Sequence, residues 1–135
     1  DGKYINVSKL GEPMISKNEV IIANLLNDHR NQIRYSYEDK LKFEDTGRTV
    51  RPDFIIDHLV SGRRFYWEHL GMMTLRDYRD KWEKKRAQYL NEGFVLYTHA
   101  KPTDRKVLIV TEENPNGGIN SYDIDELIKT VILQT

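Results

Sequence analysis

Two neighbouring apolar segments, "RPDFIIDHL" and "RFYWEHL", constrain the fold of this chain more than any other feature of its sequence. Both are rich in β-branched or aromatic residues, and the turn-forming letters "VSGR" separate them, which predicts a β-hairpin. If Ser61 and Gly62 form a two-residue turn, Ile55 lies opposite Glu68. Asp53 then lies diagonal to Glu68 on the same face, where two carboxylates can converge on one cation. A register shift of one residue would move Asp53 to the other face.

The other segments predict further strands with helices between them. An S-x-x-E signal at Ser16 and Glu19 starts a helix, and residues 33–43 alternate between apolar and polar as a strand does. Residues 75–93 predict a long helix, and "FVLYTH" and "KVLIVTE" predict two strands before a closing amphipathic helix, "DIDELIKTVIL". The predicted fold class is α/β, a mixed β-sheet flanked by helices in the order α-β-β-β-α-β-β-α.

Length and composition narrow the class of protein. The chain of 135 residues predicts a single domain, 1–135, in which residues 1–15 form a lead-in with either a strand at Tyr4–Val7 or no regular structure. Because it begins at Asp1 rather than Met, we expect a part of a longer protein. Basic and acidic residues number 21 each, which neither supports nor excludes nucleic-acid binding. There is no Cys for a thiolate metal site, and no apolar run approaches the about 20 residues of a membrane span. We expect a soluble, cytoplasmic protein of a prokaryote, with no membrane partner.

Asp53 and Glu68 are the first candidates for a functional site. Two close carboxylates in a partly apolar setting repel each other unless a cation or a proton lies between them. Oxygen ligands without Cys suit Mg²⁺ or Mn²⁺. The alternative is that the two acids lie at strand ends, or form structural ion pairs with Arg51, Arg63 or Arg64.

Glu19 and His69 each have a structural and a functional interpretation. Glu19 either caps its helix through Ser16 or points toward the core as a third acid above the sheet. His69 follows Glu68, so we expect its side chain on the other face of the strand, packed or hydrogen-bonded. Its backbone carbonyl lies beside Glu68 and could reach a metal.

The long helix carries an aromatic stripe with a lysine in its middle. Lys85 lies on the same helical face as Tyr78, Trp82 and Tyr89, so it should be partly buried. Either its stem packs against the rings while its amine reaches solvent, or the amine is directed at the acids and compensates their charge. A cation at that place can stabilise negative charge that develops on a phosphate.

The order of these motifs resembles the PD-(D/E)XK nuclease superfamily, which has the restriction-endonuclease-like fold. The resemblance covers residues 16–94: a helix with Glu19, then "RPDF", a turn, "YWEH" and a helix that bears Tyr and Lys. It implies that Asp53 is the motif Asp and Glu68 the acid of the third motif. It further implies that both, with the His69 carbonyl, hold Mg²⁺ or Mn²⁺, and that Glu19 assists directly or through a water.

One departure concerns the family's lysine, which stands two residues after the acid, where this chain has Leu70. The family includes members with a migrated Lys, so we expect Lys85 to take that role. RecB-like members carry Gln-x-x-x-Tyr on this helix, and Lys85 and Tyr89 have the same spacing. The sequence looks most similar to nuclease domains appended to superfamily I DNA helicases. This implies a helicase domain in the same parent chain and favours single-stranded DNA.

The implied function is metal-dependent hydrolysis of DNA phosphodiester bonds in a DNA-processing or repair protein, with Glu19, Asp53, Glu68 and Lys85 as catalytic residues. The residues expected to contact nucleic acid are Arg51, Arg63, Arg64, Arg76, Arg79 and Tyr89. A second interpretation is a catalytically inactive nucleic-acid-binding module on the same fold. A third is an α/β domain whose acids are structural.

Overall fold

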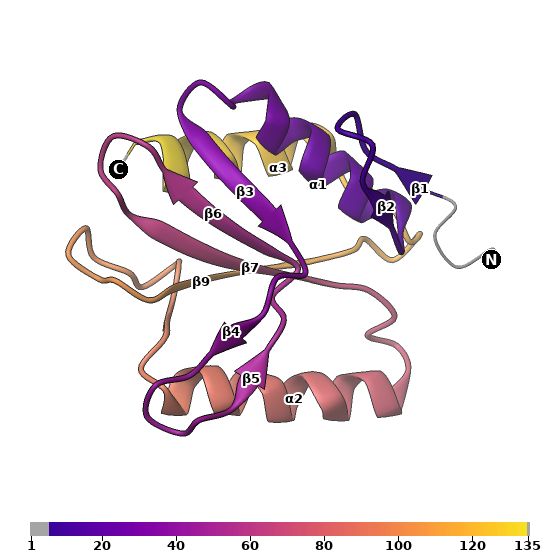
Figure 1. Ribbon diagram of the computed structural model, residues 1–135. Coiled ribbons are helices and arrows are strands. Elements are labelled where there is room, and N and C mark those ends of the chain that lie inside the picture. Colours follow the sequence, from indigo (N-terminus) through magenta and orange to yellow (C-terminus); the bar gives the residue numbers. More distant parts are fainter. Residues whose placement is uncertain (1–5, 135) are drawn as a thin grey trace.

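A five-stranded mixed sheet forms the centre of the computed structural model, which describes residues 6–134 (Figure 1). Its order is β3-β6-β7-β9-β8, antiparallel as far as β7 and parallel beyond it. The strands are β3 (Ile33–Tyr37), β6 (Phe54–His58), β7 (Arg64–Leu70), β8 (Val95–Leu96) and β9 (Val107–Glu112). Residues 1–5, which hold part of the predicted strand at Tyr4–Val7, lie outside the described residues, as does residue 135.

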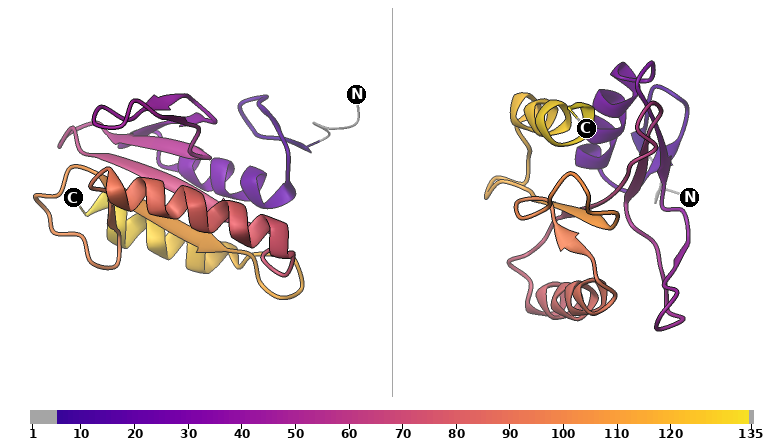
Figure 2. Two further views of the ribbon diagram at one scale, coloured as in Figure 1. Left: turned by 90° about the horizontal axis from the view of Figure 1, so that it is seen from below. Right: turned by 90° about the vertical axis from the view of Figure 1, so that its left-hand side faces the viewer.

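Helices cover both faces of this sheet. α1 (Lys17–Asp28) and α3 (Ser121–Leu127) lie on one face and α2 (Arg76–Asn91) on the other, as Figure 1 and Figure 2 show. A π-helix, Ile128–Leu133, continues α3. The arrangement confirms the predicted α/β class. None of the helices in residues 6–134 combines the length and the apolar composition needed to cross a membrane.

Four short strands within residues 6–134 form two small sheets. They are β1 (Asn6–Val7), β2 (Pro13–Met14), β4 (Leu41–Lys42) and β5 (Thr49–Val50). Two of them, β1 and β4, lie in segments where the sequence allowed a strand, Tyr4–Val7 and residues 33–43, and the other two were not predicted. β1 pairs with β2, and β4 with β5. The predicted strand over residues 33–43 is interrupted because Glu38 adopts a φ of 53°, outside the β region, just after β3 ends. "FVLYTH" contributes only β8, so the expected order is not reproduced strand for strand.

The turn of the β6–β7 hairpin is longer than the sequence predicted. The His58 amide donates to the Arg63 carbonyl at 2.9 Å, so residues 59–62 form the turn, not Ser61 and Gly62 alone. Gly62 has a φ of 72°, and its amide donates back to the His58 carbonyl at 2.9 Å. A glycine adopts this left-handed conformation without a steric penalty, which explains its place at the end of the turn.

The longer turn moves the strand register by two residues and leaves the faces unchanged. Ile55 pairs with Tyr66, where the sequence predicted Glu68. Because side chains alternate with a period of two, Asp53 and Glu68 still share a face. Pairing continued by one residue places them directly opposite each other, so the predicted diagonal arrangement is wrong although the predicted face is right.

Each face of the sheet packs against its own core. Trp67 and Phe54 belong to the core under α1 and α3, whereas Tyr66 and Ile55 belong to the core that contains Trp82 and Tyr89 of α2. This alternation in β6 and β7 directs the side chains of Asp53 and Glu68 to the face that α2 covers.

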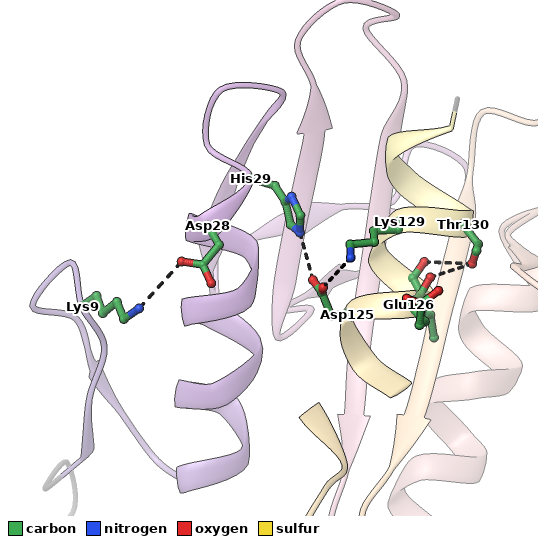
Figure 3. A network of polar contacts seen from close by, with 8 residues as sticks. Lys9, Asp28, His29, Asp125, Glu126, Lys129 and Thr130 are labelled. Atoms are coloured by element: carbon green, nitrogen blue, oxygen red, sulfur yellow. Dashed lines mark hydrogen bonds and ion pairs between the residues drawn. The ribbon is translucent and has the colours of Figure 1, made fainter. Parts of the chain in front are cut away.

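A polar network joins α1 to α3 (Figure 3). His29, after the end of α1, lies 2.9 Å from Asp125 of α3, and Lys129 lies 3.2 Å from the other oxygen of the same carboxylate. Partial burial raises the pKa of Asp125, but the hydrogen bonds from His29 and Lys129 outweigh it and hold this pKa below its usual value. The network therefore fastens the two helices that share one face.

Candidate functional site

Asp53 and the backbone of β7 meet where the β6–β7 ladder ends. The Asp53 carboxylate accepts a hydrogen bond of 2.7 Å from the His69 amide, so this side chain bonds to the strand beyond the last paired residues. Glu68, the residue before His69, is 4% exposed and points to the same face. The structure therefore brings together the two acids that the sequence placed in one site.

Glu68 is held from α2 by two donors on a single oxygen. The Tyr89 hydroxyl donates to Oε2 at 2.6 Å, and the Lys85 ammonium lies 2.6 Å from the same oxygen. Lys85 also donates to the Arg51 carbonyl at 3.3 Å, which ties α2 to the segment that leads into β6. The amine is thus directed at the acids, the second of the two orientations that the aromatic stripe allowed.

A cavity of about 200 Å³ lies between these acids and α2. The residues that line it are Asp53, Glu68, His69, Leu70, Tyr78, Lys81, Trp82 and Lys85. Two carboxylates and two lysines thus share one small space with aromatic and aliphatic walls. A larger cavity of about 630 Å³ lies at the start of β7, next to Arg63, and contains neither of the paired acids.

Burial disfavours the charged forms of both acids. Burial raises the pKa of Asp53 well above its ordinary value, and the charge of Glu68 raises it further, against the His69 amide, which lowers it. Burial also raises the pKa of Glu68, although the ion pair with Lys85 opposes this. Lys85 compensates only part of the charge, so a further cation in the cavity would relieve both carboxylates.

Glu19 is first of all a helix cap. Its carboxylate accepts from the Ser16 amide at 3.2 Å, and the Ser16 hydroxyl accepts from the Glu19 amide at 3.2 Å, which completes a capping box. The capping interpretation is confirmed. Glu19 does not line the acid cavity, but its charge raises the pKa of Asp53, so it lies within electrostatic reach of that acid. Burial raises the pKa of Glu19 itself.

The His69 side chain lies on the opposite face from Glu68, as the alternation predicted. Its Nδ1 atom is 2.8 Å from the Thr111 hydroxyl, which also accepts a bond of 2.9 Å from Trp67. Burial lowers the pKa of His69. Its Nε2 atom is buried without a hydrogen-bond partner in the described residues. In an extended strand the amide and carbonyl of one residue point the same way, which directs the His69 carbonyl toward Asp53.

The residues predicted to contact nucleic acid do not form one group. Arg63 lies at the far end of the hairpin, where it donates to the Lys101 and Asp104 carbonyls. Arg64 forms a two-bond ion pair with Asp57, at 2.6 and 3.1 Å. Neither lines the cavity that holds the acids.

The other four members of that predicted set lie near the acids or on α2. Arg51 is exposed beside Lys85, and Arg76 is exposed near the start of α2. Arg79 donates to the Met73 and Thr74 carbonyls and so braces the loop after β7. Tyr89 is 0% exposed with its hydroxyl on Glu68, so the prediction that it touches nucleic acid is wrong.

Sequence reasoning missed Tyr78 and Lys81 as cavity residues and Tyr89 as the partner of Glu68. The signal was present, because Tyr78 and Tyr89 belong to the stripe that carries Lys85. The faces of α2 and β7 had to be matched in space before that stripe could be assigned to Glu68.

The arrangement offers carboxylate oxygens, a backbone carbonyl and an ammonium group in one cavity. Within residues 6–134, no group of three or more His, Asp or Glu side chains is placed to hold a metal ion together. Any divalent ion here would thus take two side-chain carboxylates and fill its other positions with carbonyl, water or substrate oxygens. Neither a scan against protein-family models nor a search of curated proteins finds a match to this chain.

Proposed function

We propose that this chain is a metal-dependent DNA nuclease domain. The observation that carries the proposal is the pairing of Asp53 with Glu68 across the end of the hairpin, with Lys85 on Glu68. Two acids whose pKa values are raised by burial, one of them also by the charge of the other, in a cavity lined by lysines, are typical of a catalytic site. The motif resemblance to PD-(D/E)XK nucleases supports the same function.

The donor set fits Mg²⁺ or Mn²⁺. Mg²⁺ is commonly bound through one or two carboxylates together with water and substrate phosphates, so a pair of acids is enough. Asp53, Glu68 and the His69 carbonyl would hold the ion, and Glu19 would act through a water. When bound, the ion lowers the pKa of a water and polarises the scissile phosphate.

The protein residues have distinct tasks in this proposal. The Lys85 ammonium either breaks its ion pair with Glu68 or keeps it while also contacting the phosphate. In both cases it stabilises negative charge that develops on the phosphate in the narrow cavity. Tyr89 keeps the Glu68 carboxylate oriented through its 2.6 Å hydrogen bond. The His69 amide does the same for Asp53. Lys81, at the cavity wall, adds a cation for the DNA backbone.

Carboxylate substitutions test the proposal directly. Asp53→Asn and Glu68→Gln should each abolish cleavage of plasmid and single-stranded DNA in Mn²⁺ or Mg²⁺, because each removes a charged ligand and keeps the side-chain volume. EDTA should abolish wild-type cleavage. Asp57→Asn is the matched control, since Asp57 lies on β6, the strand that follows Asp53, but pairs with Arg64 away from the cavity. Undiminished cleavage by both acid variants would refute the assignment.

The role of Lys85 needs its own variant. Lys85→Met keeps most of the apolar stem and should reduce the cleavage rate by about 10²-fold or more, the loss typical of one electrostatic contact to the transition state. Circular dichroism would establish that the variant is folded. A normal rate in a folded Lys85→Met protein would remove Lys85 from the mechanism and leave the metal assignment standing.

One observation favours a second candidate, a nucleic-acid-binding module without catalysis. Leu70 is 6% exposed and lines the cavity at the position where the family places its lysine. This candidate predicts DNA binding that persists in EDTA and no cleavage in Mn²⁺. The structural alternative predicts neither, and predicts no Mn²⁺ binding by calorimetry.

A further inference from the structure

Tyr78 of α2 stands at the boundary between two cavities. It lines the cavity of about 200 Å³ that holds Asp53 and Glu68, and it also lines a neighbouring cavity of about 410 Å³ at the start of α2. Lys81 shares both linings. A ligand that is held at the acids and extends along the first turns of α2 therefore passes the Tyr78 side chain.

The Tyr78 hydroxyl has one contact to the protein. Its oxygen accepts a long hydrogen bond, 3.4 Å, from the amide of Gly71, which directly follows β7. This contact places the hydroxyl at the end of the strand that carries Glu68. Within residues 6–134, no carbonyl, carboxylate or other acceptor takes the proton of the hydroxyl. A hydroxyl accepts and donates at the same time, so the donor function of Tyr78 is left for a ligand.

Three acids lie within electrostatic reach of this hydroxyl. Burial raises the pKa of Tyr78, although the hydrogen bond from the Gly71 amide lowers it. The negative charges of Asp53, Glu68 and Glu19 raise it further. Since the ordinary pKa of a tyrosine is already about 10, the hydroxyl keeps its proton at neutral pH. It is therefore a neutral donor beside a group of carboxylates.

A neutral donor suits this place for an electrostatic reason. A phosphate that approaches two buried carboxylates is repelled by them, and a donor to one of its non-bridging oxygens offsets part of that repulsion. A second cationic side chain would pair with the acids, as Lys85 does with Glu68, and would compete with a divalent ion for them. A hydroxyl contacts the phosphate without neutralising the acids.

We infer that Tyr78 is a further catalytic residue, whose hydroxyl donates a hydrogen bond to a non-bridging oxygen of the phosphate in the acid cavity. The inference rests on the proposed nuclease function and adds a substrate contact to it. The Gly71 amide occupies one lone pair of the hydroxyl oxygen and so restricts how the hydroxyl turns. The donor is thus oriented before the substrate binds, which is the condition for efficient electrostatic stabilisation.

Tyr78→Phe removes the hydroxyl and keeps the ring in the wall of both cavities. With oligothymidine in Mn²⁺, we expect cleavage to be slower by about 10-fold or more, the effect of losing one hydrogen bond to a charged group. Tyr97→Phe is the matched control, because Tyr97 is also half-buried and lines two cavities that contain neither Asp53 nor Glu68. It should cleave at the wild-type rate. Circular dichroism establishes that both variants are folded.

Sulfur substitution separates a phosphate contact from a structural effect. Tyr78→Phe also leaves the Gly71 amide without its acceptor, and a loosened site would cleave every substrate more slowly by the same factor. The probes are labelled oligothymidines with one phosphorothioate linkage, as separate Rp and Sp diastereomers, and a gel follows cleavage at that linkage.

Sulfur accepts hydrogen bonds weakly, so it removes the same contact from the side of the substrate. For one diastereomer, the rate loss caused by sulfur should be smaller in Tyr78→Phe than in the wild type, by up to about 10-fold. For the other diastereomer, the rate loss should be equal in the two proteins, because its sulfur replaces the oxygen that Tyr78 does not contact.

A binding measurement tests the contact independently of cleavage. The probe is the dinucleotide pTpT, titrated by calorimetry in Ca²⁺ and checked by chromatography for integrity. Tyr78→Phe should bind it about 10-fold more weakly than the wild type, again by the loss of one hydrogen bond to a charged group. Tyr97→Phe should bind it as the wild type does.

The two assays distinguish failure of the Tyr78 contact from failure of the proposed function. Undiminished cleavage by Tyr78→Phe, or sulfur effects equal to those of the wild type for both diastereomers, would overturn the contact and leave the nuclease standing. No cleavage by the wild type would overturn the nuclease, and pTpT then decides on Tyr78. Weaker binding by Tyr78→Phe supports a phosphate contact in a binding module, whereas equal binding or none overturns it.

Discussion

A single carboxylate oxygen connects α2 to the candidate site. Oε2 of Glu68 receives both the Tyr89 hydroxyl and the Lys85 ammonium, while the neighbouring His69 amide is bonded to Asp53. Burial raises the pKa of Tyr89 far above its ordinary value, and the Glu68 charge adds to this, so the hydroxyl stays a donor throughout the working pH range. Tyr89 is thus an orienting residue rather than a surface contact.

Tyr89→Phe removes only this donor. We expect the free energy of unfolding to fall by about 1.5–3 kcal/mol, the usual contribution of a hydrogen bond to a charged group. Urea unfolding at neutral pH measures this loss. Tyr122→Phe is the control, since Tyr122 is 70% exposed and should give no change. Equal stabilities of the two variants would contradict the role of the hydroxyl.

At the scale of elements, the end of α2 fastens the β4–β5 hairpin. Glu92 follows the last residue of α2, and its carboxylate accepts from the Asp45 amide at 2.9 Å and the Thr46 amide at 3.3 Å. Lys106, beside β9, lies 3.7 Å from the same side chain. Phe43 of the hairpin also packs edge-on against Tyr89, with ring centroids 5.5 Å apart. α2 therefore positions both the acids and the hairpin beside them.

Glu92→Gln should loosen that hairpin in a pH-dependent way. The hydrogen bond from the Asp45 amide is the main reason that the pKa of Glu92 is lowered. An acid whose pKa is lower in the folded state than in the unfolded chain stabilises the fold at pH values above its unfolded-state pKa. This contribution is lost as pH falls through the folded-state pKa. At neutral pH, hydrogen exchange at the Asp45 and Thr46 amides should be faster in the variant. Glu83→Gln, exposed on α2, should leave both amides as protected as in the wild type.

At the scale of the whole molecule, the fold concentrates unfavourable charge at one end of its sheet. Burial is the main cause that raises the pKa of both Asp53 and Glu68. The charge of Glu19 raises the pKa of Asp53 further. Two apolar cores on opposite faces hold the strands that impose this proximity. The domain thus gives up stability at the place where a divalent ion would restore it.

In the absence of divalent metal, the unfavourable burial of these carboxylates should make the free energy of unfolding depend on pH. An acid with a raised folded pKa contributes stability that is complete below its unfolded pKa, about 4, and is lost as pH rises through the folded value. Asp53→Asn removes this loss, so its free energy of unfolding should exceed that of the wild type increasingly as pH rises. Urea unfolding at a series of pH values in EDTA measures the difference.

At neutral pH, Mn²⁺ should make the wild type more stable than the Asp53→Asn protein, the reverse of their order in EDTA. An ion that binds only the folded state raises the melting temperature of the wild type in proportion to the logarithm of its concentration. The Asp53→Asn protein should respond little. A pH-independent difference between the two proteins, together with equal responses to Mn²⁺, would show that the Asp53 carboxylate neither destabilises the fold as pH rises nor holds the ion.

The sequence alone determined which residues face the same way. Alternation in "RPDFIIDHL" and "RFYWEHL" depends only on the period of an extended strand, so Asp53 and Glu68 share a face whether the register is off by two or not. The helical period likewise placed Lys85 on one stripe with Tyr78 and Tyr89. Local periodicity is a property of the chain and needs no partner.

Only the tertiary structure decided which faces meet. The turn over residues 59–62 set the register of the hairpin. The packing of α2 on β7 made Tyr89 the hydrogen-bond donor to Glu68 and buried its ring in the core, where the sequence had predicted a surface contact. The same packing left Arg63 and Arg64 at the far end of the hairpin. These outcomes depend on contacts between residues far apart in the chain, which arise from burial of both faces at once and leave no local signal in the sequence.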